Sequence, residues 1–376
     1  METKAINTKL KGHARVDVAD VLRGLAVMGI IILHSIEHFN FYSFPDTAEQ
    51  SAWLNFSDKA IWNGLFFMFG GKAYAIFALL FGFSFFIQDD NQRLRGNDFR
   101  LRFCWRLILL FLIGNINASF FTAEVLVLYS LVGFILPLTC RLKDKWIFAL
   151  ACLLLIQPLP LYYVIRACLD PEFVTPAIPT RSFWNATFAV QSNGNFLETI
   201  RVNLWEGQLA SLAWAWDHGR VFQTAALFLL GMLIGRKGLF LKEHLKVWNK
   251  VLAGSLISFF PLYGLGNMLP DFITNKSILT PLSLIITSLS NFAFMLIAFY
   301  KTNLHDGLMK ITPYGKMSLT NYITQSIVGS MLYYNWGFAL HNQFGITASC
   351  LAGIVFFILQ FSFCRWWMNH HSHGPM

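Results

Sequence analysis

Ionisable side chains fall within one apolar stretch, VADVLRGLAVMGIIILHSIEHFNFY, which covers residues 18–42. Among them are Arg23, His34, Glu37 and His38. Ionisable groups are expensive inside a bilayer, so a membrane-spanning segment that carries them is expected to use them. A neutral imidazole, with its ordinary pKa of about 6.5, can take a proton from a hydroxyl or an ammonium group. The stretch is therefore typical of a polar path that reaches from the cytoplasm into the membrane.

Helical spacing places these groups on one stripe. His34 follows Arg23 by eleven residues, about three turns, so both share a face roughly 16 Å apart along the axis. His38 follows one turn later, and Gly24 and Gly29 permit close packing against a neighbouring helix. Other interpretations are snorkelling for Arg23 and a structural hydrogen bond for a histidine. A metal site at the two histidines would have two ligands where four are usual, so we predict no metal.

The elements that position this stripe must lie in a membrane. Of the 376 residues, 55% are hydrophobic and 13% charged, which is too apolar for a soluble chain of this length. We expect an all-α integral membrane protein, a bundle of about ten transmembrane helices forming one domain over residues 1–376. The six cysteines form no CxxC pair and predict neither a disulfide framework nor a zinc site. The ten apolar segments lie roughly at 21–40, 61–87, 103–121, 123–140, 146–166, 218–236, 249–269, 278–300, 314–337 and 345–367.

Charge asymmetry orients the bundle. The stretches DDNQRLRGNDFRLRFCWR and GRKGLFLKEHLKVWNK hold many of the 29 Lys and Arg, which marks the cytoplasmic side. Both termini are then cytoplasmic. The long loop 167–217 is extracytoplasmic, and its stretch NFLETIRVNLWEGQLASLAWAW predicts an amphipathic helix on the membrane surface. The net charge of +9 reports this topology rather than nucleic-acid binding.

Four sequence patterns carry a family resemblance. They are DVLRGLAVMGIIILH, FGGKAYAIFALLFGFSFFIQ, TAALFLLGMLIGRKGLF and ITPYGKMSLTNYITQSIVGSMLYY. With them the chain resembles, over nearly its whole length, the family called domain of unknown function 418, the YeiB-like bacterial membrane proteins. The last pattern, similar to the family's G-[RK]-M-x-LTNY-x-x-QS signature, is the most specific. The resemblance implies a multi-pass protein of the bacterial cytoplasmic (inner) membrane.

The resemblance also implies a relationship to the transmembrane acyltransferase superfamily, which includes the acyltransferase-3 proteins and heparan-glucosaminide N-acetyltransferase. In the acyltransferase-3 proteins an Arg and an essential His stand eleven apart on the first span, as Arg23 and His34 do here. Many YeiB-like relatives have Asn at the position of His34. Where the family usually has G-x-x-H followed by GDIL, this chain has Asn117 for the histidine and Glu124 for the aspartate.

If the chain is an enzyme, it is an acyl-CoA-dependent acyltransferase. His34 is the first candidate for base or acyl acceptor and His38 the second, with Glu37 or Glu124 as the group that orients a histidine or polarises the carbonyl. The donor's phosphates call for basic residues, although positive cytoplasmic loops explain the arginines equally well. Residues assigned to the donor or to a pocket or gate are Arg23, Lys72, Arg102, Arg106, Asn321 and Gln325.

Several assignments stay open. Lys72, preceded by two glycines, sits at a helix break or pairs with an acid such as Glu124. The stretch WDHGR binds an anionic or glycan acceptor or, more in keeping with its position, anchors the chain at the interface. A proton-coupled transporter and a non-catalytic lipid-binding protein are the alternatives to the acyltransferase. Expected partners are membrane lipids and a glycan or lipid acceptor, with a second copy of the chain as a further candidate and no nucleic acid.

Overall fold

The computed structural model describes residues 17–42, 44, 48, 50–170, 172–174, 176, 178–268 and 279–375. Within these ranges the chain is helical and contains no strand. In chain order the helices are α2 (Asp17–Ile36), α3 (Ala52–Phe69), α4 (Lys72–Leu94), α5 (Arg100–Ala118), α6 (Leu126–Val132), α7 (Ile135–Thr139), α8 (Asp144–Leu155), α9 (Pro158–Leu169), α10 (Thr180–Asn193), α11 (Phe196–Val202), the π-helix η1 (Asn203–Gly207), α12 (Gln208–Asp217), α13 (Arg220–Arg236), the short η2 (Lys242–His244), α14 (Leu245–Met268), α15 (Thr280–Lys301), α16 (His305–Met309), α17 (Thr312–Lys316), α18 (Ser318–Tyr333), the short η4 (Leu340–Asn342) and α19 (Ile346–His370).

The protein is an all-helical membrane protein. Two bent helix pairs, α8 with α9 at 47° and α11–α12 with α13 at 72°, each have the apolar length of a span. If each bent pair counts as one span, the described residues contain seven candidate spans, and without the pairs they contain five. The sequence had predicted about ten. The five stretches that are long and apolar enough without them are Asp17–Ile36, Ala52–Leu94, Arg100–Ala118, Pro281–Lys301 and Ile346–His370.

Two expected spans are each divided into two short helices. The segment 123–140 forms α6 and α7, and the segment 314–337 forms α17 and α18. None of these four reaches the roughly 20 residues that a straight crossing needs. Helices α10 to α12 occupy much of the expected loop 167–217. Its side of the membrane, like that of both termini, stays a prediction. Parts of these expectations lie outside the described residues, namely 1–16, 171, 175, 177, 269, 278 and 376.

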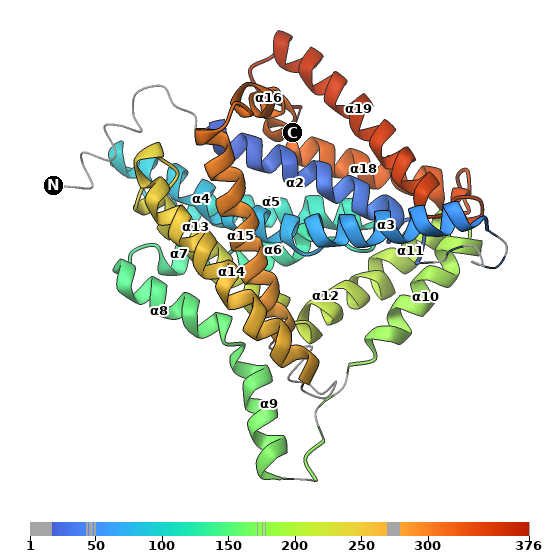
Figure 1. Ribbon diagram of the computed structural model, residues 1–376, viewed down its shortest axis with the longest axis horizontal. Coiled ribbons are helices and arrows are strands. Elements are labelled where there is room, and N and C mark those ends of the chain that lie inside the picture. Colours follow the sequence, from blue (N-terminus) through green and yellow to red (C-terminus); the bar gives the residue numbers. More distant parts are fainter. Residues whose placement is uncertain are drawn as a thin grey trace.

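Helix α2 lies at the centre of the bundle. It packs against α3, α4, α17, α18 and α19, and most of its side chains are buried. Figure 1 shows α18 and α19 alongside α2, the paired α14 and α15 crossing the bundle, and α9 extending away from it. A helix that is enclosed on so many sides can carry polar groups away from lipid, which the stripe on α2 requires.

Glycines let neighbouring backbones touch at two crossings. A Cβ on Gly82 of α4 would overlap the carbonyl oxygen of Phe228 on α13, and a Cβ on Gly231 of α13 would overlap that of Leu79 on α4. On α17, a Cβ on Gly315 would overlap the carbonyl oxygen of Asp20. Small residues of this kind allow the close approach that holds helices together in lipid.

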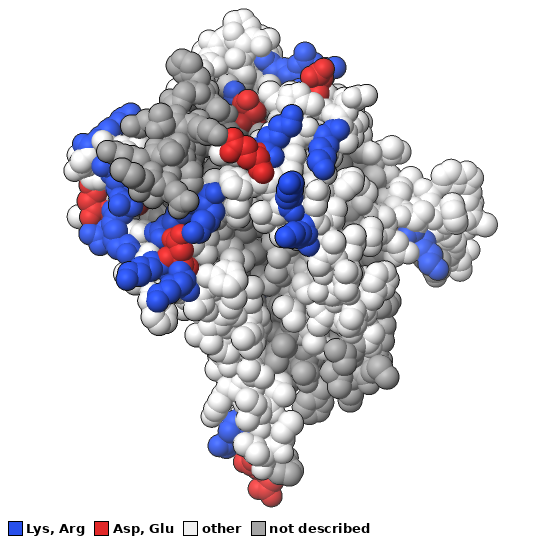
Figure 2. Space-filling model, turned by 60° about the vertical axis from the view of Figure 1, so that its left-hand side comes forward, with Lys and Arg blue, Asp and Glu red and all other residues white. Residues whose placement is uncertain are grey.

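One part of the surface carries most of the charge. Figure 2 shows Lys and Arg side chains gathered there among a few acidic ones, with large uncharged areas elsewhere on this face. Arg141 lies 2.9 Å from Asp89 and 3.3 Å from Asp98, and Asp98 lies 2.6 Å from Arg100. Arg100 and Arg141 are therefore engaged with acidic neighbours.

The crossing of α4 and α13 gives a stability prediction. We expect Gly82→Ala and Gly231→Ala each to destabilise the protein by about 2 kcal/mol, because the new methyl group pushes against backbone that cannot move aside. Gly254→Ala on α14 is the matched control, since a Cβ there meets nothing within 4 Å. Thermal unfolding in detergent measures all three variants. Equal stability of the three would contradict the close contact of α4 with α13.

Candidate functional site

A cavity with a volume of about 990 Å³ lies among the helices. Asp20 and Arg23, near the start of α2, are part of its wall, and so are His34, Glu37 and His38 at and just beyond the end of α2. Since α2 has 20 residues, it is about 30 Å long. The stripe inferred from helical spacing therefore faces one cavity along most of this length.

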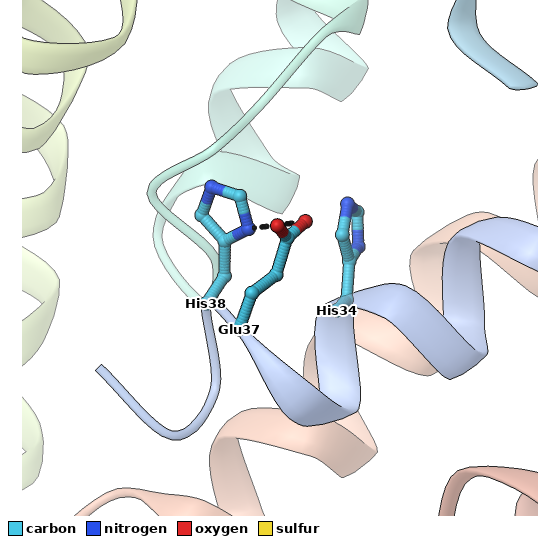
Figure 3. A group of neighbouring side chains, drawn as sticks. All are labelled: His34, Glu37 and His38. Carbon is cyan, nitrogen blue, oxygen red and sulfur yellow. Dashed lines mark ion pairs between the residues drawn. The ribbon is translucent and has the colours of Figure 1, made fainter. Parts of the chain in front are cut away.

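The two histidines and Glu37 form a cluster. Figure 3 shows the carboxylate of Glu37 between the imidazole rings of His34 and His38. Glu37 Oε1 lies 2.9 Å from His38 Nδ1. This is the distance of an ion pair when the ring is protonated, although Nδ1 makes no hydrogen bond to the carboxylate. It is thus His38, the second candidate, that has a carboxylate partner.

The backbone turns sharply after this cluster. Phe41 and Tyr42 have φ angles of 55° and 54°, which is uncommon for bulky side chains. The turn brings the hydroxyl of Tyr42 to 3.4 Å from His38 Nε2 and 3.5 Å from Glu37 Oε2. Backbone strain of this kind is often found at functional sites, and here it positions a hydroxyl beside Nε2 of His38.

His34 lies deeper along α2 than His38. Its ring centroid is 4.7 Å from that of Phe121 and 5.4 Å from that of His38. Its Nδ1 is buried and has no hydrogen-bond partner among the described residues. Neither Glu37 nor Glu124 forms an ion pair with it in that part of the chain. Of the two imidazoles, His34 is the one without a carboxylate beside its ring in the described part of the chain, so its Nδ1 can meet a ligand or a substrate.

The arginines that the sequence analysis assigned to an acyl-CoA donor do not lie together. Arg23 is on the cavity wall, where it donates to Asp20 at 2.6 Å and to Ser84 at 2.5 Å. Arg102 and Arg106 are exposed and lie outside the cavity, and Arg106 donates to Gln88. Of the three, Arg23 alone is placed to meet a molecule in the cavity, where Lys316 and Ser318 line the wall as well.

Glu124 reaches the same cavity from the segment between α5 and α6. Asn117 donates a hydrogen bond to its carboxylate, and the backbone N–H of Leu126 donates a second at 2.5 Å. Burial raises the pKa of Glu124 to about 7, even though these hydrogen bonds act in the opposite direction. Asn117 and Glu124, which replace a histidine and an aspartate of the family pattern, thus form a pair with each other.

Lys72 marks a helix break rather than an ion pair. Gly71, with a φ of 67°, separates α3 from α4, and Lys72 is the first residue of α4. Its Nζ donates to the carbonyl of Phe66 at 3.4 Å, so the pair considered with Glu124 does not form. Arg220 of the WDHGR stretch is also buried on the cavity wall. Anchoring at the interface had been favoured for this stretch because sequence alone does not reveal the burial of Arg220.

The C-terminal signature contributes residues other than those predicted. Asn321 donates to the carbonyl of Tyr314 at 3.0 Å and is buried between helices, and buried Gln325 also lies off the cavity wall. The pocket or gate role predicted for both residues is therefore not supported by their positions. Instead, Ser318 and Tyr322 of the same signature line the cavity. Helical spacing limits which residues of α18 can share a face, but the angle at which α18 crosses its neighbours determines which of them line the cavity.

The cluster on α2 has the donor atoms of a metal site. One ligand atom from each of His34, Glu37 and His38 lies within 4.8 Å of the others. Two nitrogens and one carboxylate oxygen would leave a fourth, open position on a tetrahedral ion such as Zn²⁺. Sequence spacing had suggested two ligands only, because Glu37 is adjacent to His38 and need not face the same way.

The chain is similar to a family of unknown function and to two uncharacterised proteins. Residues 234–376 match the family described as "Protein of unknown function (DUF418)", which supports the resemblance inferred from the sequence patterns. The "Uncharacterized protein YxaH" of Bacillus subtilis (strain 168) is 25% identical over 396 aligned residues, covering 96% of this chain and 92% of its own length. The "Uncharacterized 39.9 kDa protein in amylase 3'region" of Bacillus acidopullulyticus is 23% identical over 367 residues, with 96% and 91% covered. No solved structure matches the chain.

The raised pKa of Glu124 predicts a dependence of stability on pH. Since the fold favours the protonated carboxyl, its contribution is fully present below the ordinary pKa of 4.5 and is lost as the pH rises through about 7. We expect Glu124→Gln, which stays neutral, to gain thermal stability relative to wild type between about pH 5 and about pH 8. Thermal unfolding in detergent across this range measures the difference. Exposed Glu172 gives the control Glu172→Gln, and a constant difference for Glu124→Gln would show that Glu124 does not titrate there.

Proposed function

We propose that this member of the DUF418 family is a membrane-embedded acyltransferase of the bacterial inner membrane. It passes an acyl group from a cytoplasmic acyl-CoA-type donor to a hydroxyl or amine of a glycan or lipid acceptor. One observation carries the proposal: Arg23 and His34, eleven residues apart on α2, line a single cavity of about 990 Å³. An anionic donor and a proton-accepting imidazole can therefore meet in one enclosed space.

The reaction needs a base at the point where donor and acceptor meet. Nδ1 of His34, buried and without a partner among the described residues, is the candidate. It takes the proton of the acceptor's O–H or N–H as the oxygen or nitrogen attacks the thioester carbonyl. The new C–O or C–N bond forms, the C–S bond breaks, and the proton passes to the departing thiolate. In a route through an acyl-imidazole, His34 itself holds the acyl group between two such transfers.

His38 and Glu37 support this step. The carboxylate of Glu37 lies 2.9 Å from Nδ1 of His38, and Nε2 of His38 faces the hydroxyl of Tyr42. Such a pair can pass a proton between the cavity and the end of α2. At the other end, Arg23 is the residue available to the donor's phosphates, and binding there competes with its contacts to Asp20 and Ser84.

The first test is thiol release from acyl-CoA by the purified protein. We expect His34→Ala to lower turnover by about 10²–10⁴-fold, the usual contribution of a general base, while acyl-CoA still binds. The matched control is His305→Ala on exposed α16, which should turn over like wild type. Calorimetric titration with acyl-CoA separates loss of binding from loss of chemistry.

Two outcomes would count against the proposal. If neither wild type nor His34→Ala binds acyl-CoA, the acyltransferase is wrong and proton-coupled transport takes its place as the working hypothesis. If both proteins bind and turn over equally, His34 is not the base, and the same comparison moves to His38→Ala.

A metal test separates a free base from a metal centre. Since the proposed reaction needs an unligated His34, we expect chelation with EDTA to leave turnover unchanged and added Zn²⁺ to inhibit it through the cluster of three donor atoms. Glu37→Gln should weaken the inhibition, because an amide is a poorer zinc ligand than a carboxylate. Loss of turnover on chelation, with recovery on adding Zn²⁺, would instead identify the cluster as a metal centre.

A further inference from the structure

Two buried cations on the cavity wall have no acidic partner. Lys72 and Arg220 are 8% and 9% exposed, and both line the cavity. Neither lies within 4.0 Å of a carboxylate oxygen in the described part of the chain. A buried charge without a counter-ion is strongly unfavourable, so these two positions call for an anion.

The neighbours of Arg220 hold it without neutralising it. Its Nη1 donates to Gln223 at 2.8 Å. The guanidinium lies 4.9 Å from the ring centroid of Tyr74 and 5.5 Å from that of Trp214. An arginine has five N–H donors, and stacking on two rings fixes its plane while leaving its edge for an acceptor.

Lys72 is held still more weakly. Its hydrogen bond to the carbonyl of Phe66 is long, at 3.4 Å, and the ring centroid of Phe67 lies 5.5 Å from Nζ. An ammonium group has three donors, and these contacts supply no negative charge. The acids that line the cavity contact other groups instead: Asp20 pairs with Arg23, Glu37 with His38, and Glu124 accepts from Asn117.

Helix starts converge on the same place. Lys72 opens α4 and Arg220 opens α13, each after a glycine with positive φ, 67° at Gly71 and 65° at Gly219. Neither helix has a side-chain N-cap. A Cβ built on Gly71 would lie 3.0 Å from Arg220 Nη2, so the two starts are adjacent. Gln223 also donates to the carbonyl of Pro281, at 3.3 Å, near the start of α15.

We propose that Lys72, Arg220 and the uncapped amide groups at the starts of α4 and α13 bind the phosphate group of a ligand. Helix starts add positive potential and N–H donors to the two charged side chains, and a phosphate accepts from several donors at once. Phe66, Phe69 and Leu284 line the cavity as well, so an apolar part of the ligand has a surface to cover. This site stands whether or not His34 catalyses acyl transfer.

The phosphate can belong to a lipid or to a soluble molecule, and the probes separate the two. The full chain in detergent is titrated with dioleoyl phosphatidic acid, with dioleoylglycerol, which has the same tails without phosphate, and with pyrophosphate. Thermal unfolding and the fluorescence of the tryptophans report binding. We expect phosphatidic acid or pyrophosphate to bind and stabilise the protein, and dioleoylglycerol to do neither. Binding of phosphatidic acid alone assigns the site to a lipid phosphate, and binding of pyrophosphate assigns it to a soluble one.

Charge-removing variants tie the binding to the two cations. Lys72→Met and Arg220→Met should each weaken the Kd of the binding probe at least about tenfold, as loss of a charge-assisted contact does. Lys72→Arg and Arg220→Lys, which keep the charge, should bind within a few-fold of wild type and show that the fold is intact. The control is Lys59→Met on α3, where the lysine is exposed.

Two results would overturn the site: neither phosphate probe binds the wild type, or a probe binds wild type and both methionine variants alike. Because acyl-CoA turnover is measured separately, the phosphate site can fail while acyl transfer stands. The reverse also holds, since loss of turnover in wild type does not affect the titrations with phosphatidic acid or pyrophosphate.

Discussion

Contact between helix backbones at glycine is the constraint on which the rest of this structure depends. Lipid tails are as apolar as the side chains of a helix, so moving those side chains from lipid into a helix interface gains little free energy. Helices in lipid therefore associate where their backbones can approach closely. Gly82 and Gly231 allow this between α4 and α13, and Gly315 allows it between α17 and α2. These contacts set the positions of α2, α4 and α13, three of the helices whose side chains form the cavity wall.

The acidic and the basic groups on the cavity wall differ in the contacts that they make. The three acids on its wall contact groups in the described part of the chain: Asp20 contacts Arg23, Glu37 contacts His38, and Glu124 contacts Asn117. Lys72 and Arg220 instead have neutral neighbours. The space is therefore suited to anions, whether they arrive as the phosphates of a thioester donor or on another molecule. A negative ligand would gain from both cations without displacing an internal carboxylate.

The sequence was informative where one helix was enough. Helical spacing put Arg23, His34 and His38 on one stripe, and all three line the cavity, although His38 lies just beyond the end of α2. The two glycines before Lys72 indicated a helix break, and Gly71 separates α3 from α4. The sequence was less informative about how one helix packs against another. The segment expected as one span at 314–337 is two helices, and Asn321 and Gln325 lie off the cavity although Ser318 and Tyr322 of the same signature line it.

By itself, the sequence determined an apolar all-helical membrane protein that resembles the DUF418 family and has a polar stripe on its first described helix. These features depend on composition and on the 3.6-residue period, which act within a segment. The tertiary structure decided that Glu37 lies beside His38, that Glu124 pairs with Asn117, and that the buried guanidinium of Arg220 lies against Gly71. The last contact joins residues nearly 150 positions apart. Such contacts depend on which helices touch and at what angle, and no local pattern specifies that.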